Sequence, residues 1–203
     1  MQNDNPLSEL EMQRKGRKVF MLMLVFFVVP IIVVIMMYHY NWKPNGVSLG
    51  ELVQPPRMLN SAVNLQDSDA KVLKPLFWKE KWSVVFVTDT CEKVCLDKLR
   101  DMRQLHVSLY KDIERTQRVL ITTAEDVTKI KQDYPDLIVI NQPLTNVKAL
   151  SQQFDVNNEV ANVAGRLYLV DPLGHLMMSY RTDVPLADVR KDITRLLRYS
   201  WAG

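Results

Sequence analysis

The stretch Trp82–Leu99, WSVVFVTDTCEKVCLDKL, decides the fold of this chain. It opens with the apolar run Val84–Val87, in which every residue except Phe86 is β-branched. Such a run predicts a strand buried on both faces, as at the centre of an α/β sheet. The polar segment Thr88–Thr90 follows, and its side-chain oxygens predict a cap for a helix that comes next.

The two cysteines of the chain, Cys91 and Cys95, lie where this helix is expected to begin. The unpaired N–H groups and the dipole at a helix N-terminus favour thiolate over thiol. Cysteines four residues apart face the same side of a helix, so their sulfurs could form a disulfide or hold one soft metal ion. The alternative is that both pack as small hydrophobic side chains, with Cys95 on the apolar stripe. Because both cysteines lie at one strand-to-helix junction, we favour a chemical role for the pair.

An uncharged apolar run precedes this region, from Val19 to Tyr38, and is long enough to cross a hydrocarbon core roughly 30 Å thick. It is apolar on every face and no small-residue cleavage site follows it, so we predict a membrane anchor over residues 19–40 that binds the lipid bilayer. Basic residues gather in Arg14–Lys18, whereas Lys43 alone follows closely, which predicts a cytoplasmic N-terminus. Acidic residues near the N-terminus argue against a mitochondrial transit peptide. We therefore expect a bacterial inner-membrane protein whose C-terminal domain is periplasmic.

The sequence predicts four regions in all, of which one is a folded domain. The regions are a cytoplasmic segment (1–18), the anchor (19–40), a tether with short extended pieces or a hairpin (41–75) and the domain (76–203). The domain is expected to hold further strands at 119–123, 137–140, 167–170 and 175–180, and helices at 125–133, at 146–154 and from Pro185, with Asp183 as a cap. Strands that alternate with helices and end in a hairpin and a helix are typical of an α/β fold.

Several kinds of chemistry are absent from the sequence. The formal net charge is +3, and the basic residues form no patch suited to nucleic acid. The chain has no glycine-rich phosphate loop, no His-Glu-x-x-His pair and no Gly-x-Ser-x-Gly elbow. His39, His106 and His175 have no partner at metal-ligand spacing and are interpreted as structural. Met177 and Met178 are soft donors, but packing in a strand explains them as well.

The anchor and three later segments, KWSVVFV (81–87), CEKVC (91–95) and LYLVDPLG (167–174), resemble the SCO/SenC family. Members of this family are membrane-tethered thioredoxin-like proteins linked to copper delivery and to the assembly of cytochrome c oxidase. The resemblance covers about Leu76–Arg198. It implies a thioredoxin-like fold, and it implies that Cys91 and Cys95 are a redox-active or copper-binding pair.

The sequence departs from the family pattern at the cysteine motif and at the third copper ligand. Glu92 and Leu96 replace the prolines that usually follow the two cysteines. The family's copper-ligating histidine stands five residues before the late-strand tyrosine, and here that position is Val163. Gly165 occupies the place where thioredoxins tend to have a cis-proline.

These features together support three hypotheses. The first is thiol–disulfide exchange with a cytochrome c oxidase subunit or another assembly factor, in which Cys91 attacks, Cys95 resolves and no cofactor is required. The second is a Cu(I) chaperone that holds the metal through both thiolates plus a Met, a His or a ligand from a partner, because thiolates are soft donors that suit Cu(I) better than Cu(II). The third is a scaffold in which a disulfide only staples the start of the helix.

Overall fold

A computed structural model describes residues 6–40, 48–60 and 65–200 of the chain. The chain forms two compact units, Met1–Val47 and Ser48–Gly203. The described part of the first unit is one long helix, and its stretch Arg14–His39 is long and apolar enough to cross a membrane. None of that stretch is buried in the structure. The second unit holds the cysteines and the sheet.

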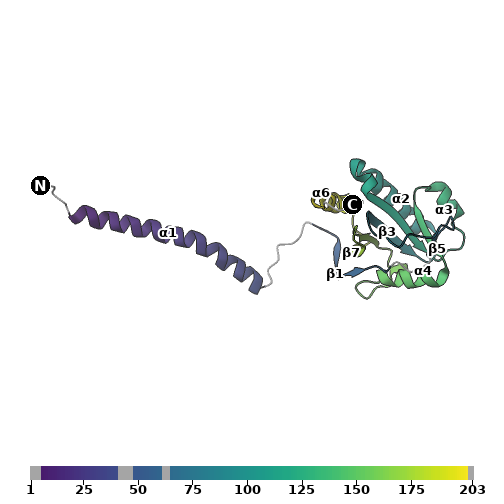
Figure 1. Cartoon of the computed structure of the whole chain (residues 1–203), viewed down its shortest axis with the longest axis horizontal. Coiled ribbons are helices and arrows are strands. Elements are labelled where there is room, and N and C mark those ends of the chain that lie inside the picture. The colour runs from purple at the N-terminus through teal and green to yellow at the C-terminus, as the bar shows by residue number, and fades with distance from the viewer. Residues whose placement is uncertain (1–5, 41–47, 61–64, 201–203) are drawn as a thin grey trace. The chain divides into compact units, whose positions relative to one another are not determined.

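The bounds of the elements, several of which Figure 1 labels, follow chain order. They are α1 (Pro6–His39), β1 (Glu51–Met58), β2 (Gln66–Asp67), β3 (Trp82–Thr88), α2 (Lys93–Val107), η1 (Tyr110–Arg115), β4 (Thr116–Thr122), α3 (Thr128–Asp133), β5 (Ile138–Gln142), α4 (Leu144–Ser151), η2 (Gln152–Phe154), α5 (Ala161–Ala164), β6 (Leu167–Val170), β7 (His175–Tyr180) and α6 (Leu186–Tyr199).

The strands form one mixed, 7-stranded sheet in the order β1-β7-β6-β3-β4-β5-β2. Strands β3, β4 and β5 run parallel, and β6 lies antiparallel to β3 on its other side. The β6–β7 hairpin turns at Asp171–Gly174, where Gly174 has a φ of 90° and its N–H donates to the Asp171 carbonyl. The cysteines follow the last residue of β3, so they lie at the end of the sheet formed by the carboxyl ends of the parallel strands.

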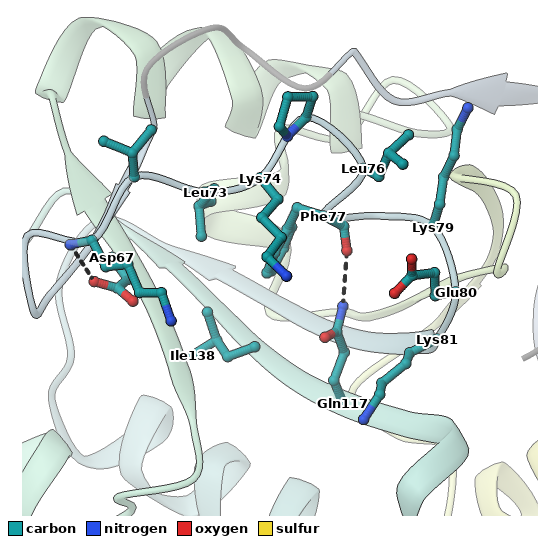
Figure 2. A pocket seen from close by; sticks show the side chains of 13 residues that line it. Asp67, Leu73, Lys74, Leu76, Phe77, Lys79, Glu80, Lys81, Gln117 and Ile138 are labelled. Atoms are coloured by element: carbon teal, nitrogen blue, oxygen red, sulfur yellow. Dashed lines mark hydrogen bonds between the residues drawn. The ribbon is translucent and has the colours of Figure 1, made fainter.

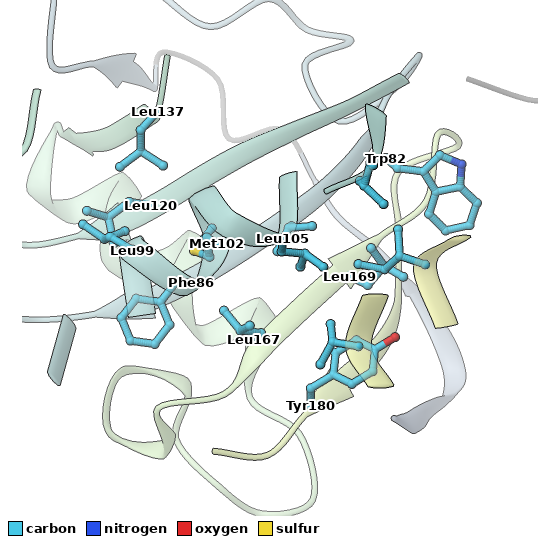
Figure 3. Close-up of a cluster of buried hydrophobic side chains, with 14 of the residues drawn as sticks. Trp82, Phe86, Leu99, Met102, Leu105, Leu120, Leu137, Leu167, Leu169 and Tyr180 are labelled. Atoms are coloured by element: carbon cyan, nitrogen blue, oxygen red, sulfur yellow. The ribbon is translucent and has the colours of Figure 1, made fainter. Parts of the chain in front are cut away.

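Alternate residues of β3 face opposite sides of the sheet, which makes it the shared centre of two cores. Val84 and Phe86 join a core formed with α2, α3 and α6, and Val85 and Val87 join a core formed with α4, α5 and η2. Figure 3 shows the first core, in which Leu99 from α2 faces Phe86 and neighbouring sheet residues. Helices α2 and α4 accordingly lie on opposite sides of the sheet in Figure 1. The predicted α/β, thioredoxin-like architecture is confirmed.

Several predicted details are also confirmed, and others are corrected. The hairpin strands have the bounds that the sequence predicted, and α6 begins directly after Pro185. The helix expected at 125–133 begins only at Thr128. Asp183 does not cap α6, because its carboxylate instead pairs with Arg181 at 3.3 Å.

The segment 41–75 contributes two strands to the sheet, and these are not a hairpin. Strand β1 pairs with β7 at one edge of the sheet, and β2 pairs with β5 at the other. A tight approach explains Gly50, which precedes β1. A Cβ there would lie 2.6 Å from the Tyr180 ring and 2.8 Å from the Met178 methyl group.

Candidate functional site

The structure joins Cys91 and Cys95 in a disulfide, with their Cα atoms 4.9 Å apart. The two sulfurs differ in exposure. Cys95 is 3% exposed and belongs to the core under α2, whereas Cys91 is only partly buried and packs against the edge of that core. A partner would therefore reach Cys91 first, while Cys95 is held behind it.

Helix α2 begins two residues after Cys91, with Glu92 as its N-cap residue, so Cys95 lies in the first turn and Cys91 just before it. No side chain caps this helix. The expected cap from Thr88–Thr90 is wrong, because these residues bond elsewhere: the Thr88 hydroxyl donates to the Thr90 carbonyl at 2.8 Å. The free N–H groups of the first turn thus remain near the cysteine pair, where they favour a thiolate.

Asp89 holds the cysteine loop to its neighbours on two sides. Its Oδ1 accepts hydrogen bonds from the Asn162 amide at 2.7 Å and from the Thr123 hydroxyl at 3.1 Å. Its carbonyl also accepts from the hydroxyls of Thr122 and Thr123, each at 3.2 Å. The end of β3 is therefore fixed both to the end of β4 and to α5.

The short helix α5 places one exposed apolar side chain, Val163, at this end of the sheet. Val163 is 83% exposed and stands next to Asn162, which bonds to Asp89. The helix ends at Gly165, whose φ of 63° is left-handed and suits glycine. The residue at the position of the family's third copper ligand is thus at the same end of the sheet as the cysteines, but it carries no donor atom.

Arg166 directly follows Gly165, and its buried side chain pairs with two glutamates. Its side chain is 5% exposed, and it donates to Glu159 and to Glu51, each at 2.7 Å. The hydrogen bond from Arg166 lowers the pKa of Glu159 and raises that of Arg166 itself. The network ties the start of β1 to the loop that leads into α5.

The histidines of the second unit lie at the other end of the strands from the cysteines, where the parallel strands begin. His106 is near the end of α2, and its Nε2 lies 3.3 Å from the carbonyl of Thr116, the first residue of β4. His175 is the first residue of β7, and its Nδ1 lies 3.2 Å from an Asp171 carboxylate oxygen. Among the described residues, no group of three or more His, Cys, Asp and Glu side chains is arranged to hold a metal. Copper at this site would be held by the two sulfurs after reduction.

A hollow of about 730 Å³ also lies at this end of the sheet, where the parallel strands begin. Its floor includes Leu73, Phe77 and Ile138. Figure 2 shows the amino group of Lys74 pointing across this floor toward Gln117, whose amide donates to the Phe77 carbonyl at 3.3 Å. Neither cysteine nor histidine lines the hollow, so it is separate from the cysteine pair.

A family model described as "Transmembrane-like, thioredoxin-like, C-terminal domain" matches residues 82–200. The chain belongs to this family. The matched part of this thioredoxin-like protein begins at β3 and includes the disulfide, α5 and α6. No curated protein matches the chain.

Solved structures of Sco proteins share the fold of this thioredoxin-like protein. Yeast Sco1 with copper bound matches at 18% identity and a TM-score of 0.57, over 78% of this chain and 96% of that one. Apo Sco1 of Thermus thermophilus matches at 18% identity and a TM-score of 0.57, over 76% of this chain and 99% of that one. BsSco matches at 14% identity and a TM-score of 0.55, over 73% of this chain and 99% of that one. BsSco is described as a member of the Sco family of cytochrome c oxidase assembly proteins in which a disulfide switch was identified. The resemblance to SCO/SenC proteins is thereby confirmed for the fold.

The sequence located the cysteine pair but missed the residues that hold it. The sequence places Asp89 in a predicted helix cap, and it gives no signal at Asn162. Their hydrogen bond joins residues 73 positions apart, and no local pattern marks such a pair. The one usable signal was the place of Asp89 directly after a buried strand, where a polar side chain has neighbouring strand ends within reach.

Proposed function

We propose that this protein is a membrane-anchored thiol–disulfide exchange protein that assists the assembly of cytochrome c oxidase. The observation that carries the proposal is the disulfide with one accessible and one buried sulfur, at the start of a helix in a Sco fold. BsSco, which shares this fold, is described both as an oxidase assembly protein and as having a disulfide switch.

The exchange uses the two sulfurs in sequence. In the reduced form, the Cys91 thiolate attacks a disulfide of the partner, forms a mixed disulfide and releases one partner sulfur as a thiolate. Cys95 then attacks the Cys91 sulfur, which releases the second partner sulfur and restores the Cys91–Cys95 bond. The partner gains two electrons, and a dithiol reductant must reopen the bond for another cycle.

The location belongs to the same proposal. The apolar stretch Arg14–His39 is expected to cross a bacterial inner membrane, with the basic end at Arg14–Lys18 in the cytoplasm. The unit Ser48–Gly203 is then periplasmic, in a compartment where disulfides persist.

A Cys95→Ser variant tests the mechanism, because it cannot resolve the mixed disulfide. We expect it to be recovered from membranes as a covalent complex with an oxidase subunit or another assembly factor, separable by a reductant. The matched control is Cys91→Ser, which should trap far less because Cys95 is buried. Equal trapping by both variants, or none by Cys95→Ser when the protein is folded and reduced, contradicts the assigned roles.

Copper carriage is the second candidate, since yeast Sco1 was solved with copper bound. The reduced pair offers two soft sulfurs that suit Cu(I), whereas Cu(II) prefers nitrogen and oxygen donors. We expect the reduced unit Ser48–Gly203 to take up at most one Cu(I) and to bind Cu(II) weakly. The variant Val163→His should strengthen Cu(II) binding. Tight binding of Cu(II) by the unaltered protein would favour the copper role over exchange.

A further inference from the structure

We propose that the outer face of α6 binds the anionic headgroups of a phospholipid bilayer. This face, which we term the basic face, consists of Arg190, Lys191, Arg195 and Arg198. The opposite face of the helix packs Val189, Ile193 and Leu197 into the core. The proposal does not depend on the thiol chemistry.

The burial pattern of α6 places the basic side chains together. Buried residues recur at three- and four-residue spacing along the helix, so the exposed residues between them share the remaining surface. Arg190, Lys191, Arg195 and Arg198 are all exposed, and Tyr199 beside them is 77% exposed. Arginine and an exposed aromatic ring are the side chains that membrane interfaces favour.

Most of the positive charge on this face is not neutralised within the protein. Lys191 pairs with Asp188 at 2.8 Å. Among the described residues, Arg190, Arg195 and Arg198 form no ion pair. The other carboxylate of the helix, Asp192, is 8% exposed and accepts a hydrogen bond inside the fold. An external anionic surface is therefore the natural complement of the three arginines.

The choice of a bilayer rests on where the chain enters the unit. Ser48, its first residue, donates through its hydroxyl to Asp192 of α6 at 2.7 Å. The segment 41–47 that precedes Ser48 follows directly on the apolar helix. The chain thus carries its own membrane-directed element, and Ser48, the first residue of the second unit, is bonded to the helix that bears the basic face.

Vesicle binding tests the proposal on residues 48–203, which form a compact unit with two cores of their own. Sedimentation compares vesicles of phosphatidylcholine with vesicles that contain about 30% phosphatidylglycerol, at low salt. We expect binding to the anionic vesicles only, and its loss in 0.5 M salt because screening removes the attraction. Equal binding to both kinds of vesicle, or to neither, overturns the proposal.

Charge reversal locates the binding surface. The variant Arg190→Glu/Arg195→Glu/Arg198→Glu should lose on the order of a hundredfold in affinity for anionic vesicles, because each cation near such a surface contributes about 1 kcal/mol. The matched control reverses Lys98, Arg100 and Arg103, which lie on α2 and of which Lys98 and Arg100 are already paired. Circular dichroism confirms that both variants are folded. Retained binding by the α6 variant, or an equal loss in the control, contradicts the assignment to α6. If the basic face binds an acidic protein and not the vesicles, the choice of a bilayer is contradicted.

Discussion

Cys91 and Cys95 share one disulfide bond but differ in exposure, and we expect this difference to set which sulfur reacts first. Cys95 lies in the first turn of α2 and is buried in the core that the helix covers, while Cys91 precedes the helix and remains partly exposed. Access is a requirement for exchange that is separate from the thiolate fraction. After reduction, we expect iodoacetamide to modify Cys91 at least about ten times faster than Cys95, since only the outer sulfur is open to solvent. Mass spectrometry of peptides taken at early times measures the ratio, and equal rates would contradict it.

Asn162 is expected to hold α5 against the cysteine loop. Its amide donates to the Asp89 carboxylate at 2.7 Å, and a bond to a charged acceptor is stronger than a neutral one. Asn162→Ala should cost about 1 kcal/mol in the free energy of unfolding and speed amide hydrogen exchange over 161–164. Val163→Ala is the control, because that side chain is 83% exposed. If both variants exchange as slowly as the unaltered protein, the Asp89–Asn162 bond does not fix α5.

His106 gives the protein a predicted sensitivity to mild acid. Burial, and then the charge of Arg118, lower its pKa below the usual 6.5, although Asp136 and the Thr116 carbonyl act in the opposite sense. The unfolded chain therefore takes up a proton just below pH 6.5 while the folded protein does not, and stability falls as the pH falls through this range. Urea unfolding between pH 7.5 and 5 should show this loss, and His106→Gln should reduce it. An unchanged pH profile in the variant would contradict this role of His106.

Burial on both faces explains why β3 was the most predictable element of the fold. The continuous run Val84–Val87 fills two cores at once, so its pattern could have only one structural meaning in an α/β chain. Strand β1 was not predictable in the same way. It contains Pro55 and Pro56 and lies at a sheet edge, so its place depends on pairing with β7 far away in the sequence. The start of α2 was misjudged because Asp89 bonds to α5 instead of capping the helix.

Strand β1 depends on the absence of a side chain at Gly50. A Cβ would come within 3.0 Å of the side chains of Tyr180 and Met178, which are 2% and 4% exposed. Gly50→Ala should therefore cost about 1–3 kcal/mol in the free energy of unfolding, as overpacking of a core does. Urea unfolding measures the change. An alanine variant as stable as the unaltered protein would show that β1 can move away from β7 at little cost.

The chain joins an apolar helix, long enough to cross a membrane, to a thioredoxin-like unit. The basic residues before that helix predict a cytoplasmic N-terminus. We expect alkaline phosphatase, which is active only after export, to be active when fused to the C-terminus of the full chain. A fusion to residue 18 should be inactive, because it lacks the apolar helix. An inactive C-terminal fusion that is stably produced would contradict the periplasmic location.

The central claim is that the Cys91–Cys95 bond opens and closes under physiological conditions. The most direct measurement is the equilibrium between the bridged and free forms in buffers of graded redox potential, read by thiol trapping of the full chain. The account predicts one reversible two-electron transition, with a midpoint between about −120 and −300 mV, which spans the thiol–disulfide exchange proteins and ends where structural disulfides begin. Thiols that stay free under oxidising buffer, or a bridge that no physiological dithiol opens, would contradict exchange; the second result would make the disulfide a structural staple.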